Sequence, residues 1–539
     1  MPRASATSPT CHILAWKSSR DRSAAWLQWA QQLPAEIIRA HPVLCLGYAW
    51  ALLNGGNLEA SEPYLRDAER WIDPPPEVAS QMVVVDAAEY RALPAATAAA
   101  RAYRALALGD IPGTIAHARR ALTLAAEDDV IRRTQATSLL GIAEYASGDL
   151  GAAERSLLAF QARMWQVGDV ADALGITFIL ANIWLAQARL RKALGAYRQV
   201  LQLATQQAAL PIGTSDLYRG LSELLIEQGD LDRAAQHLAT ARQVGEQAAL
   251  TGWLHRLAVT QARLRQTQGD WDGALALLDD AERHYVRNPL PDQPITAMKA
   301  RLWIRQGQFS LAERWAHEQG LSPDDDLDYL REFDHLTLAR LLIARYPTGP
   351  DEGPIREALR LLDRLLQTAQ DGGRTGSVIE ILMLQALARH AQGDTPAALT
   401  VLERALTLAE PEGYVRLFVD EGEAMQSLMA ECRVLIEKQK HRERRELIGY
   451  VNRLLAAFPP TTMPQSAISN QQSEWAEPLS ERELDVLVLL GTELSGPEIA
   501  DRLSVSLNTL RTHTKHIYGK LGVNSRRAAV RRAEELGLV

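Results

Sequence analysis

Cysteine, aromatic residues and long apolar runs are all scarce in this chain of 539 residues. The three cysteines, Cys11, Cys45 and Cys432, are far apart and odd in number. This excludes a disulfide framework and a C-x-x-C metal site, and it fits a reducing cytoplasm. No stretch approaches the ~18 uncharged apolar residues of a membrane helix. The N-terminal segment is rich in Ser, Thr, Pro and Arg and lacks the apolar core of a signal peptide, so we predict a flexible tail over residues 1–20.

Motifs of enzymes are missing as well. We find no G-x-S-x-G, no H-E-x-x-H, no dinucleotide-binding glycine pattern and no cluster of Cys and His. We therefore expect no catalytic residue, no metal site and no cofactor. The formal charge of −8, from 58 basic and 66 acidic residues, argues against a protein that coats nucleic acid.

The residues that are abundant favour helices. Hydrophobic residues make up 47% of the chain, which excludes a disordered protein. Ala and Leu dominate this set, whereas aromatic residues reach only 6%. Ala and Leu are strong helix formers, so the composition predicts an all-α fold.

One phrase, G-D-x-x-x-A or a close variant, recurs between apolar helical runs. Starting at Gly109, copies begin after steps of 39, 40, 41, 40, 38, 46 and 40 residues, and a more distant copy begins at Gly56. Glycine tolerates the left-handed conformation that ends a helix, and the following Asp can cap the next helix. The small Ala four residues after the Asp lets the two helices of a pair approach closely. These copies begin at Gly109, Gly148, Ala188, Gly229, Gly269, Gly307, Gly353 and Gly393.

Such helix pairs leave an apolar face that only the next pair can cover, so they stack into a superhelix. The units resemble tetratricopeptide repeats (TPRs). We predict about nine pairs over residues 21–415, a scaffold whose ligand the periodicity does not name. The acidic run of residues 322–328 lacks the spacing of a calcium loop and is predicted to be a solvated loop. Six tryptophans could line a concave pocket, but packing between repeats is the favoured interpretation: Trp50, Trp71, Trp184, Trp253, Trp271 and Trp303.

A linker follows the array. Residues 412–431 continue as helix, and the run KQKHRERRE at 438–446 is predicted to be a solvated helix face because it mixes both charges. Residues 458–477 are rich in Pro, Ser and Gln and have no period. We therefore predict a helical extension and flexible linker over residues 416–477 and a separate small domain over residues 478–539.

The last domain has the sequence signals of four short helices. Ser480 and Ser495 each have Glu three residues on and flanking apolar residues, which is the pattern of a capping box with a hydrophobic staple, and Ser506 caps a third helix. A fourth helix starts near Ser525. The second and third helices are joined only by residues 503–506, the length of a helix-turn-helix connection.

The third of these helices has two unlike faces. Leu510, Thr514, Ile517 and Leu521 share one face, whereas Arg511, Thr512, Lys515 and His516 lie opposite. A narrow core face with a basic face of short side chains suits the major groove of DNA. From residue 507 to residue 532 the chain holds seven basic residues and no acidic one. A merely solvated basic face is the less favoured interpretation, because charges of both signs are mixed on faces elsewhere in this chain.

These residues resemble the LuxR-type helix-turn-helix family over the whole of 479–539. The matching positions include Glu483, the triplet Glu498-Ile499-Ala500, Ser506, Thr509, His513, Lys520-Leu521 and Val523. The resemblance implies that Arg511, Thr512 and Lys515 face base edges and that Asn508, Thr509 and Lys520 contact phosphates. It also implies a homodimer formed through the last helix, from Ala528 to Leu536. Where the family often has Asn-Lys, this chain has Gly496-Pro497, so one phosphate contact is expected to be missing.

The order of the segments is similar to that of the large ATP-dependent LuxR-type regulators related to the maltose-regulon activator. It comprises residues 26–71, the repeats, EGYVRLFVDEG at 412–422, the linker and the DNA-binding domain. In that family a nucleotide-binding module precedes repeats that bind an inducer or inhibitory partner. This chain contains no G-x-x-x-x-G-K-[ST] motif. It is therefore either a shortened member or one whose coding start was placed late, and control by ATP is not carried over.

The leading hypothesis is a sequence-specific transcriptional regulator. The repeats would sense an unknown inducer or partner protein, the terminal domain would bind promoter DNA, and RNA polymerase is a further candidate partner. The alternative is a TPR-like interaction scaffold with little or no DNA binding. Residues 479–539 hold nine basic and eight acidic residues of the total 58 and 66, so the acidic balance belongs to the rest of the chain.

Overall fold

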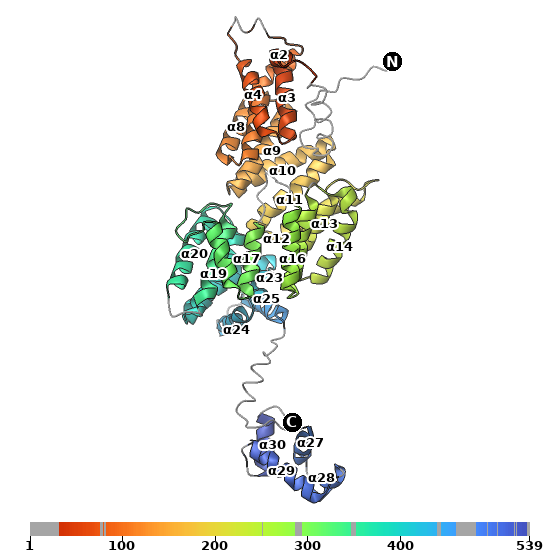
Figure 1. The fold of residues 1–539 in the computed structure, drawn as a ribbon, viewed down its shortest axis with the longest axis vertical. Coiled ribbons are helices and arrows are strands. Elements are labelled where there is room, and N and C mark those ends of the chain that lie inside the picture. The colour runs from red at the N-terminus through yellow and green to blue at the C-terminus, as the bar shows by residue number, and fades with distance from the viewer. Residues whose placement is uncertain are drawn as a thin grey trace. The chain divides into compact units, whose positions relative to one another are not determined.

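The computed structural model describes residues 32–75, 79, 82–250, 252–285, 294–346, 352–438, 444–459, 481–492, 494–503, 505–521, 523 and 525–535. Within these ranges it contains 27 α-helices and no strand, which confirms the predicted all-α class (Figure 1). The predicted tail over residues 1–20 lies outside the described residues, as do residues 439–443 and 460–477 of the predicted extension and linker. None of the described helices is long and apolar enough to cross a bilayer.

The chain divides into two compact units, residues 1–458 and 459–539. In the first unit, the described residues form nine helix pairs in chain order. The pairs are α3 (Pro42–Asn54) with α4 (Leu58–Arg70), α7 (Leu93–Leu108) with α8 (Ile111–Leu124), α9 (Val130–Ala146) with α10 (Leu150–Val167), α11 (Val170–Ala186) with α12 (Leu190–Thr205), α13 (Thr214–Glu227) with α14 (Leu231–Ala248), α15 (Trp253–Thr267) with α16 (Trp271–Arg283), α17 (Ile295–Arg305) with α18 (Phe309–Glu318), α19 (Glu332–Arg345) with α20 (Gly353–Asp371), and α21 (Thr375–Ala391) with α22 (Thr395–Ala409).

Shorter helices flank these pairs. They are α2 (Ala35–Ala40), α6 (Ala87–Arg91), the 3₁₀ helix η3 (Glu410–Glu412), α23 (Arg416–Val419), α24 (Glu423–Lys438) and α25 (Arg444–Ala457). Helices α24 and α25 pack on α22, and their apolar residues continue the largest core cluster. The boundary predicted at residue 415 therefore falls inside this unit.

The recurring Gly-Asp phrase forms the turn inside each pair. Gly109, Gly148, Gly229, Gly269 and Gly393 have φ between 78° and 84°, and the Asp that follows each accepts a backbone N–H of the next helix. The alanines four residues after the cap position are fully buried: Ala153, Ala193, Ala234, Ala274, Ala312, Ala358 and Ala398. One degenerate copy differs, because Gly353 is the first residue of α20 and has no left-handed φ.

The two helices of a pair differ in how they are buried. Helix α13 has 11 buried residues among 14, whereas α14 buries only the stripe Ala234, Leu238, Ala241, Gly245 and Ala248. The first helix of each pair thus lies inside the array and the second covers it. The six tryptophans named above are buried or packed against core clusters, so the packing interpretation is confirmed.

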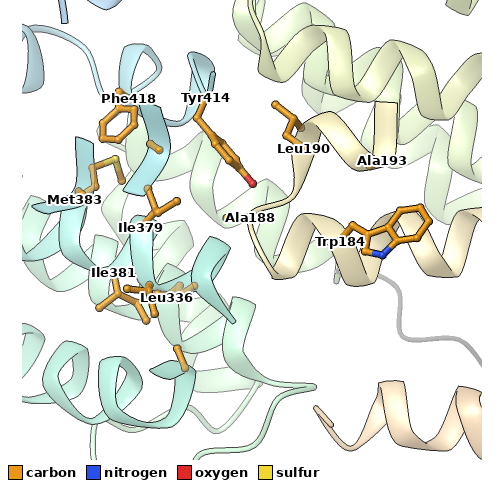
Figure 2. Close-up of a cluster of buried hydrophobic side chains, with 14 of the residues drawn as sticks. Trp184, Ala188, Leu190, Ala193, Leu336, Ile379, Ile381, Met383, Tyr414 and Phe418 are labelled. Atoms are coloured by element: carbon orange, nitrogen blue, oxygen red, sulfur yellow. The ribbon is translucent and has the colours of Figure 1, made fainter. Parts of the chain in front are cut away.

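The segment of residues 412–422, which follows the last pair and is called the closing segment here, returns to helices from the middle of the array. The Tyr414 hydroxyl donates to the carbonyl oxygen of Leu185 at 3.4 Å, and Figure 2 shows its ring directed at the turn that holds Ala188. The backbone N–H of Val415 donates to the carbonyl oxygen of Glu227 at 3.0 Å. The array therefore closes on itself, so that α11 and α13 contact elements about 190 to 230 residues later in the chain.

The second unit contains four helices around a small core of its own. They are α27 (Glu481–Leu490), α28 (Gly496–Arg502), α29 (Leu507–Leu521) and α30 (Arg526–Glu535). Val486, Leu487, Ile499, Leu510, Ile517 and Ala529 form most of that core. The predicted four-helix domain is confirmed.

Candidate functional site

Helix α29 is positioned by the caps that the sequence predicts. The backbone N–H of Ser495 donates to Glu498 Oε2 at 2.7 Å, which forms the capping box of α28. At the start of α29, the backbone N–H of Thr509 donates to Ser506 Oγ at 3.1 Å. The flanking Leu494 and Val505 pack on the core of the unit, as hydrophobic staples do. The predicted capping box at Ser480 lies outside the described residues.

The buried face of α29 leaves its opposite face to solvent. Leu510 and Ile517 are buried, whereas Thr509, Lys515 and His516 are exposed. Arg511 and Thr512 are one helical turn before Lys515, so their backbone positions share its face. Asn508 is in the first turn and Lys520 in the last turn of α29. The side chains of Arg511, Thr512, Asn508 and Lys520 lie outside the described residues, so their predicted contacts stay predictions.

One residue of the basic run has a different role. The Arg526 guanidinium donates to the carbonyl oxygens of Leu490, Thr492 and Leu494 at 2.6 to 2.9 Å. These carbonyls lie at the end of α27 and in the turn before α28, where no helical N–H is available to them. Arg526 therefore ties α30 to the turn between α27 and α28, and it is not free to bind a phosphate as part of a solvated basic face.

The first unit holds a second candidate site, a cavity of about 1110 Å³ inside the closed array. It is lined mainly by the first helices of successive pairs, from α9 to α21, and by the closing segment. Its apolar wall includes Phe178, Met298, Phe333 and Leu336. Seven arginines and seven acidic side chains also line it.

Most of these charges pair with one another. Arg219 pairs with Glu223 at 2.7 Å and Arg263 with Glu227 at 2.5 Å, and Arg416 pairs with Asp420. On the other side, Glu380 accepts from Arg301 at 3.0 Å and from Arg340 at 2.9 Å, and Arg340 also pairs with Glu421 of the closing segment. Two lining residues have partners outside the wall: Arg256 with Asp216 at 2.5 Å, and Glu332 with Arg374 at 2.9 Å.

The pKa values reflect this crowding of charges in a buried place. Burial acts to raise the pKa of Glu380, but Arg301 and Arg340 outweigh burial and lower it to about 2. Burial lowers the pKa of Arg301 to about 10. Burial raises the pKa of Asp172, which lines the cavity from the first turn of α11, to about 8. Unlike Glu380, Asp172 has no cationic partner among the described residues.

The comparisons with known proteins agree with both parts of this architecture. Residues 95–435 match the model of the MalT-like TPR region, and residues 477–533 match the model of bacterial regulatory proteins of the luxR family. The first match covers more than half of the chain. The chain belongs to the MalT-like TPR family.

The chain is also 25% identical, over 521 residues, to the HTH-type transcriptional regulator MalT of Serratia proteamaculans (strain 568). That alignment covers 94% of this chain and 55% of the relative, so the chain spans about half the length of the relative. This sequence contains no phosphate-loop motif.

Solved structures give weaker likenesses. A Rap protein complexed with competence and sporulation factor has a TM-score of 0.46 at 13% identity, over 69% of this chain and 98% of that one. A human IFIT1 dimer with PPP-AAAA has a TM-score of 0.40 at 15% identity, over 75% of this chain and 91% of that one. Scores of this size carry no functional argument.

The MalT-like region shows what sequence reasoning missed. The cavity charges lie on six different helices and on the closing segment, so no local pattern brings them together. A usable signal was present in the first helix of each pair, where polar residues recur on otherwise apolar faces, as Arg219, Glu223 and Glu227 do on α13.

The predicted loop at 322–328 lies between α18 and α19, and its Asp325 contacts the buried His335 at 3.2 Å. Among the described residues no group of three or more His, Cys, Asp or Glu could hold a metal ion.

Proposed function

We propose that this protein is a sequence-specific transcriptional regulator that binds promoter DNA through α29 and responds to a ligand or partner of its MalT-like repeats. The observation that carries the proposal is the pairing of two parts in one chain. One is a luxR-family unit whose third helix exposes Lys515 opposite a buried face. The other is an array closed around a large cavity. The proposal gives the chain no catalytic role.

In the proposed complex, α29 enters the major groove. Arg511, Thr512 and Lys515 would read base edges, and Asn508, Thr509 and Lys520 would contact phosphates. Thr509 is exposed at the start of α29, and the positive end of the helix dipole there attracts an anion, although Ser506 already accepts the N–H of Thr509. We further propose that two copies bind a pair of half-sites through contacts of α30, and that RNA polymerase is the partner at the promoter.

The test is selection of bound sequences from a random DNA pool by the full chain, followed by binding measurements at several salt concentrations. Affinity is expected to fall steeply with salt because displaced counterions drive binding. Arg511→Ala and Lys515→Ala should each relax base preference by ~1–3 kcal/mol if the side chain makes a bidentate base contact. Arg314→Ala, which removes one exposed charge from the repeat unit, serves as the matched control.

Two outcomes would contradict the proposal. If both variants keep wild-type discrimination between bases, the assignment of the reading face is wrong. If the full chain selects no sequence and does not bind DNA at moderate salt, the scaffold alternative is correct and the repeats act alone.

A further inference from the structure

The charges of the repeat cavity leave two groups without partners. Among the described residues, every lining arginine and carboxylate has an ion-pair partner except Asp172 and Arg305. The Arg305 guanidinium lies 5.7 Å from the ring centroid of Trp271. Asp172 makes no side-chain hydrogen bond within the described part of the chain. One cavity therefore presents one free carboxyl and one free guanidinium.

These two groups lie on different helices and form no ion pair with each other. Asp172 is in the first turn of α11, whereas Arg305 is the last residue of α17, three helix pairs later. The pKa of Asp172, raised to about 8, is consistent with the lack of a nearby cation. Burial makes ionisation of this carboxyl costly, and a cationic group of a ligand would offset that cost by favouring the carboxylate.

Uncharged polar groups and apolar walls line the same cavity. The amides of Asn182 and Gln266 line the same cavity, and neither makes a side-chain hydrogen bond to another described residue. Phe178, Met298 and Phe333 supply apolar surface. A pocket of mainly apolar surface with a few free polar groups is typical of a ligand site.

We propose that the cavity binds a short peptide with free ends, with the peptide ammonium group at Asp172 and its terminal carboxylate at Arg305. A peptide supplies a cation at one end, a carboxylate at the other, amides for Asn182 and Gln266, and apolar side chains for the walls. The cavity of about 1110 Å³ exceeds what a single amino acid would fill. The inference rests on the proposed function, in which this cavity is the sensing site.

Arg305 also connects the ligand to the rest of the chain. A Cβ built on Gly422 would lie 3.5 Å from a guanidinium nitrogen of Arg305, so the side chain is beside the end of the closing segment. That segment leads directly into α24 and α25 and then toward the second unit. A carboxylate bound at Arg305 would therefore lie beside the end of the closing segment, which α24 and α25 follow directly in the chain.

The experiment uses the full chain and a random hexapeptide pool in three forms: with free ends, N-acetylated and C-amidated. Retained peptides are quantified by mass spectrometry after gel filtration, and the thermal midpoint of the chain is measured with each pool. We expect retention of the free-ended pool to exceed that of each blocked pool at least tenfold. The thermal midpoint is expected to rise only with the free-ended pool.

Variants assign each end of the peptide. Asp172→Asn should retain the N-acetylated and free-ended pools equally, and Arg305→Gln should retain the C-amidated and free-ended pools equally. Arg314→Gln, an exposed arginine outside the cavity wall, should keep the wild-type preference. Circular dichroism checks that each variant is folded, which is expected because Asn has the shape of Asp and Arg305 is exposed.

Equal retention of blocked and free pools, or no retention of any pool, would overturn the peptide assignment. Binding of selected DNA is measured on the same preparations. DNA binding without peptide retention refutes only this inference, whereas peptide retention without DNA binding refutes only the proposed function.

Discussion

Ala188 occupies a backbone position that glycine holds in most other copies of the repeat. Its φ is 57°, the only positive value at a non-glycine residue in the described ranges, and its side chain is buried at the turn between α11 and α12 (Figure 2). The left-handed conformation costs an L-residue roughly 1–2 kcal/mol. This degenerate repeat therefore keeps the turn geometry of its neighbours at the expense of local strain.

Ala188→Gly is expected to stabilise the first unit by ~0.5–1 kcal/mol, because relief of strain outweighs the greater freedom of glycine in the unfolded chain. Chemical denaturation of the full chain, followed by circular dichroism, measures this change. The matched control is Ala193→Gly, one turn into α12, where glycine should destabilise by about 1 kcal/mol or more. A loss of stability in both variants would show that Ala188 is not strained.

Asp172 gives the array a dependence on pH. Its carboxyl has a pKa of about 8 in the folded chain and about 4 when unfolded. Between these values the folded state binds the extra proton, so the contribution of this group to stability falls as pH rises from about 4 to about 8. Asp172→Asn removes the titrating group. The variant should match the wild type near pH 4 and exceed it at pH 8 by up to ~5 kcal/mol, at ~1.4 kcal/mol for each unit of the pKa difference.

The measurement is the free energy of unfolding at several pH values for both proteins. Other groups also titrate over this range, so the difference between the proteins is the informative quantity. A difference that stays constant with pH would show that Asp172 is already ionised in the folded chain.

At the scale of elements, much of the fold follows from short sequence signals. Because glycine in the left-handed region and an Asp cap have local causes, the turns at Gly109, Gly148, Gly229, Gly269 and Gly393 could be predicted. The copy at Gly353 could not, since a proline at the next position lets the helix begin at the glycine itself. The face of α29 was predictable for the same local reason, a period of 3.6 residues.

The role of Arg526 could not be predicted, because its three carbonyl partners belong to the end of α27 and to the turn after it, more than 30 residues earlier in the chain.

Arg526→Ala leaves those carbonyls without their donor and should lower the stability of the second unit by ~1–3 kcal/mol. Lys515→Ala, on the exposed face, should leave the thermal midpoint unchanged and weaken DNA binding. Calorimetry together with DNA titration separates the two effects, and a variant pair with equal midpoints would refute the structural role of Arg526.

For the first unit as a whole, closure of the array was beyond sequence reasoning. Each pair turns by a small angle relative to the one before, and a small error in that angle decides whether the closing segment reaches α11 and α13. The closure depends on contacts such as that of Glu227, whose Oε1 accepts the backbone N–H of Leu417 at 2.9 Å while its Oε2 pairs with Arg263 at 2.5 Å. Open repeat arrays have only contacts between neighbours, so this unit should unfold more cooperatively than they do.

Glu227→Ala tests whether closure holds the unit together. The substitution leaves Arg263 with only Glu223 as an ion-pair partner, at 4.0 Å, and it removes the acceptor of the Leu417 N–H. We therefore expect the free energy of unfolding to fall by ~3–5 kcal/mol. Hydrogen exchange should then speed up in α23 and α24 as well as in α13, because closure couples them. Glu412→Ala is the matched control: it removes another carboxylate that links the closing segment to the array, but its bond to the N–H of Arg191 lies at the surface, so its loss should cost less than 1 kcal/mol. If exchange in Glu227→Ala accelerates only in α13, the closing segment rests on the array without stabilising it, and ligand binding in the cavity would need another route to the DNA-binding unit.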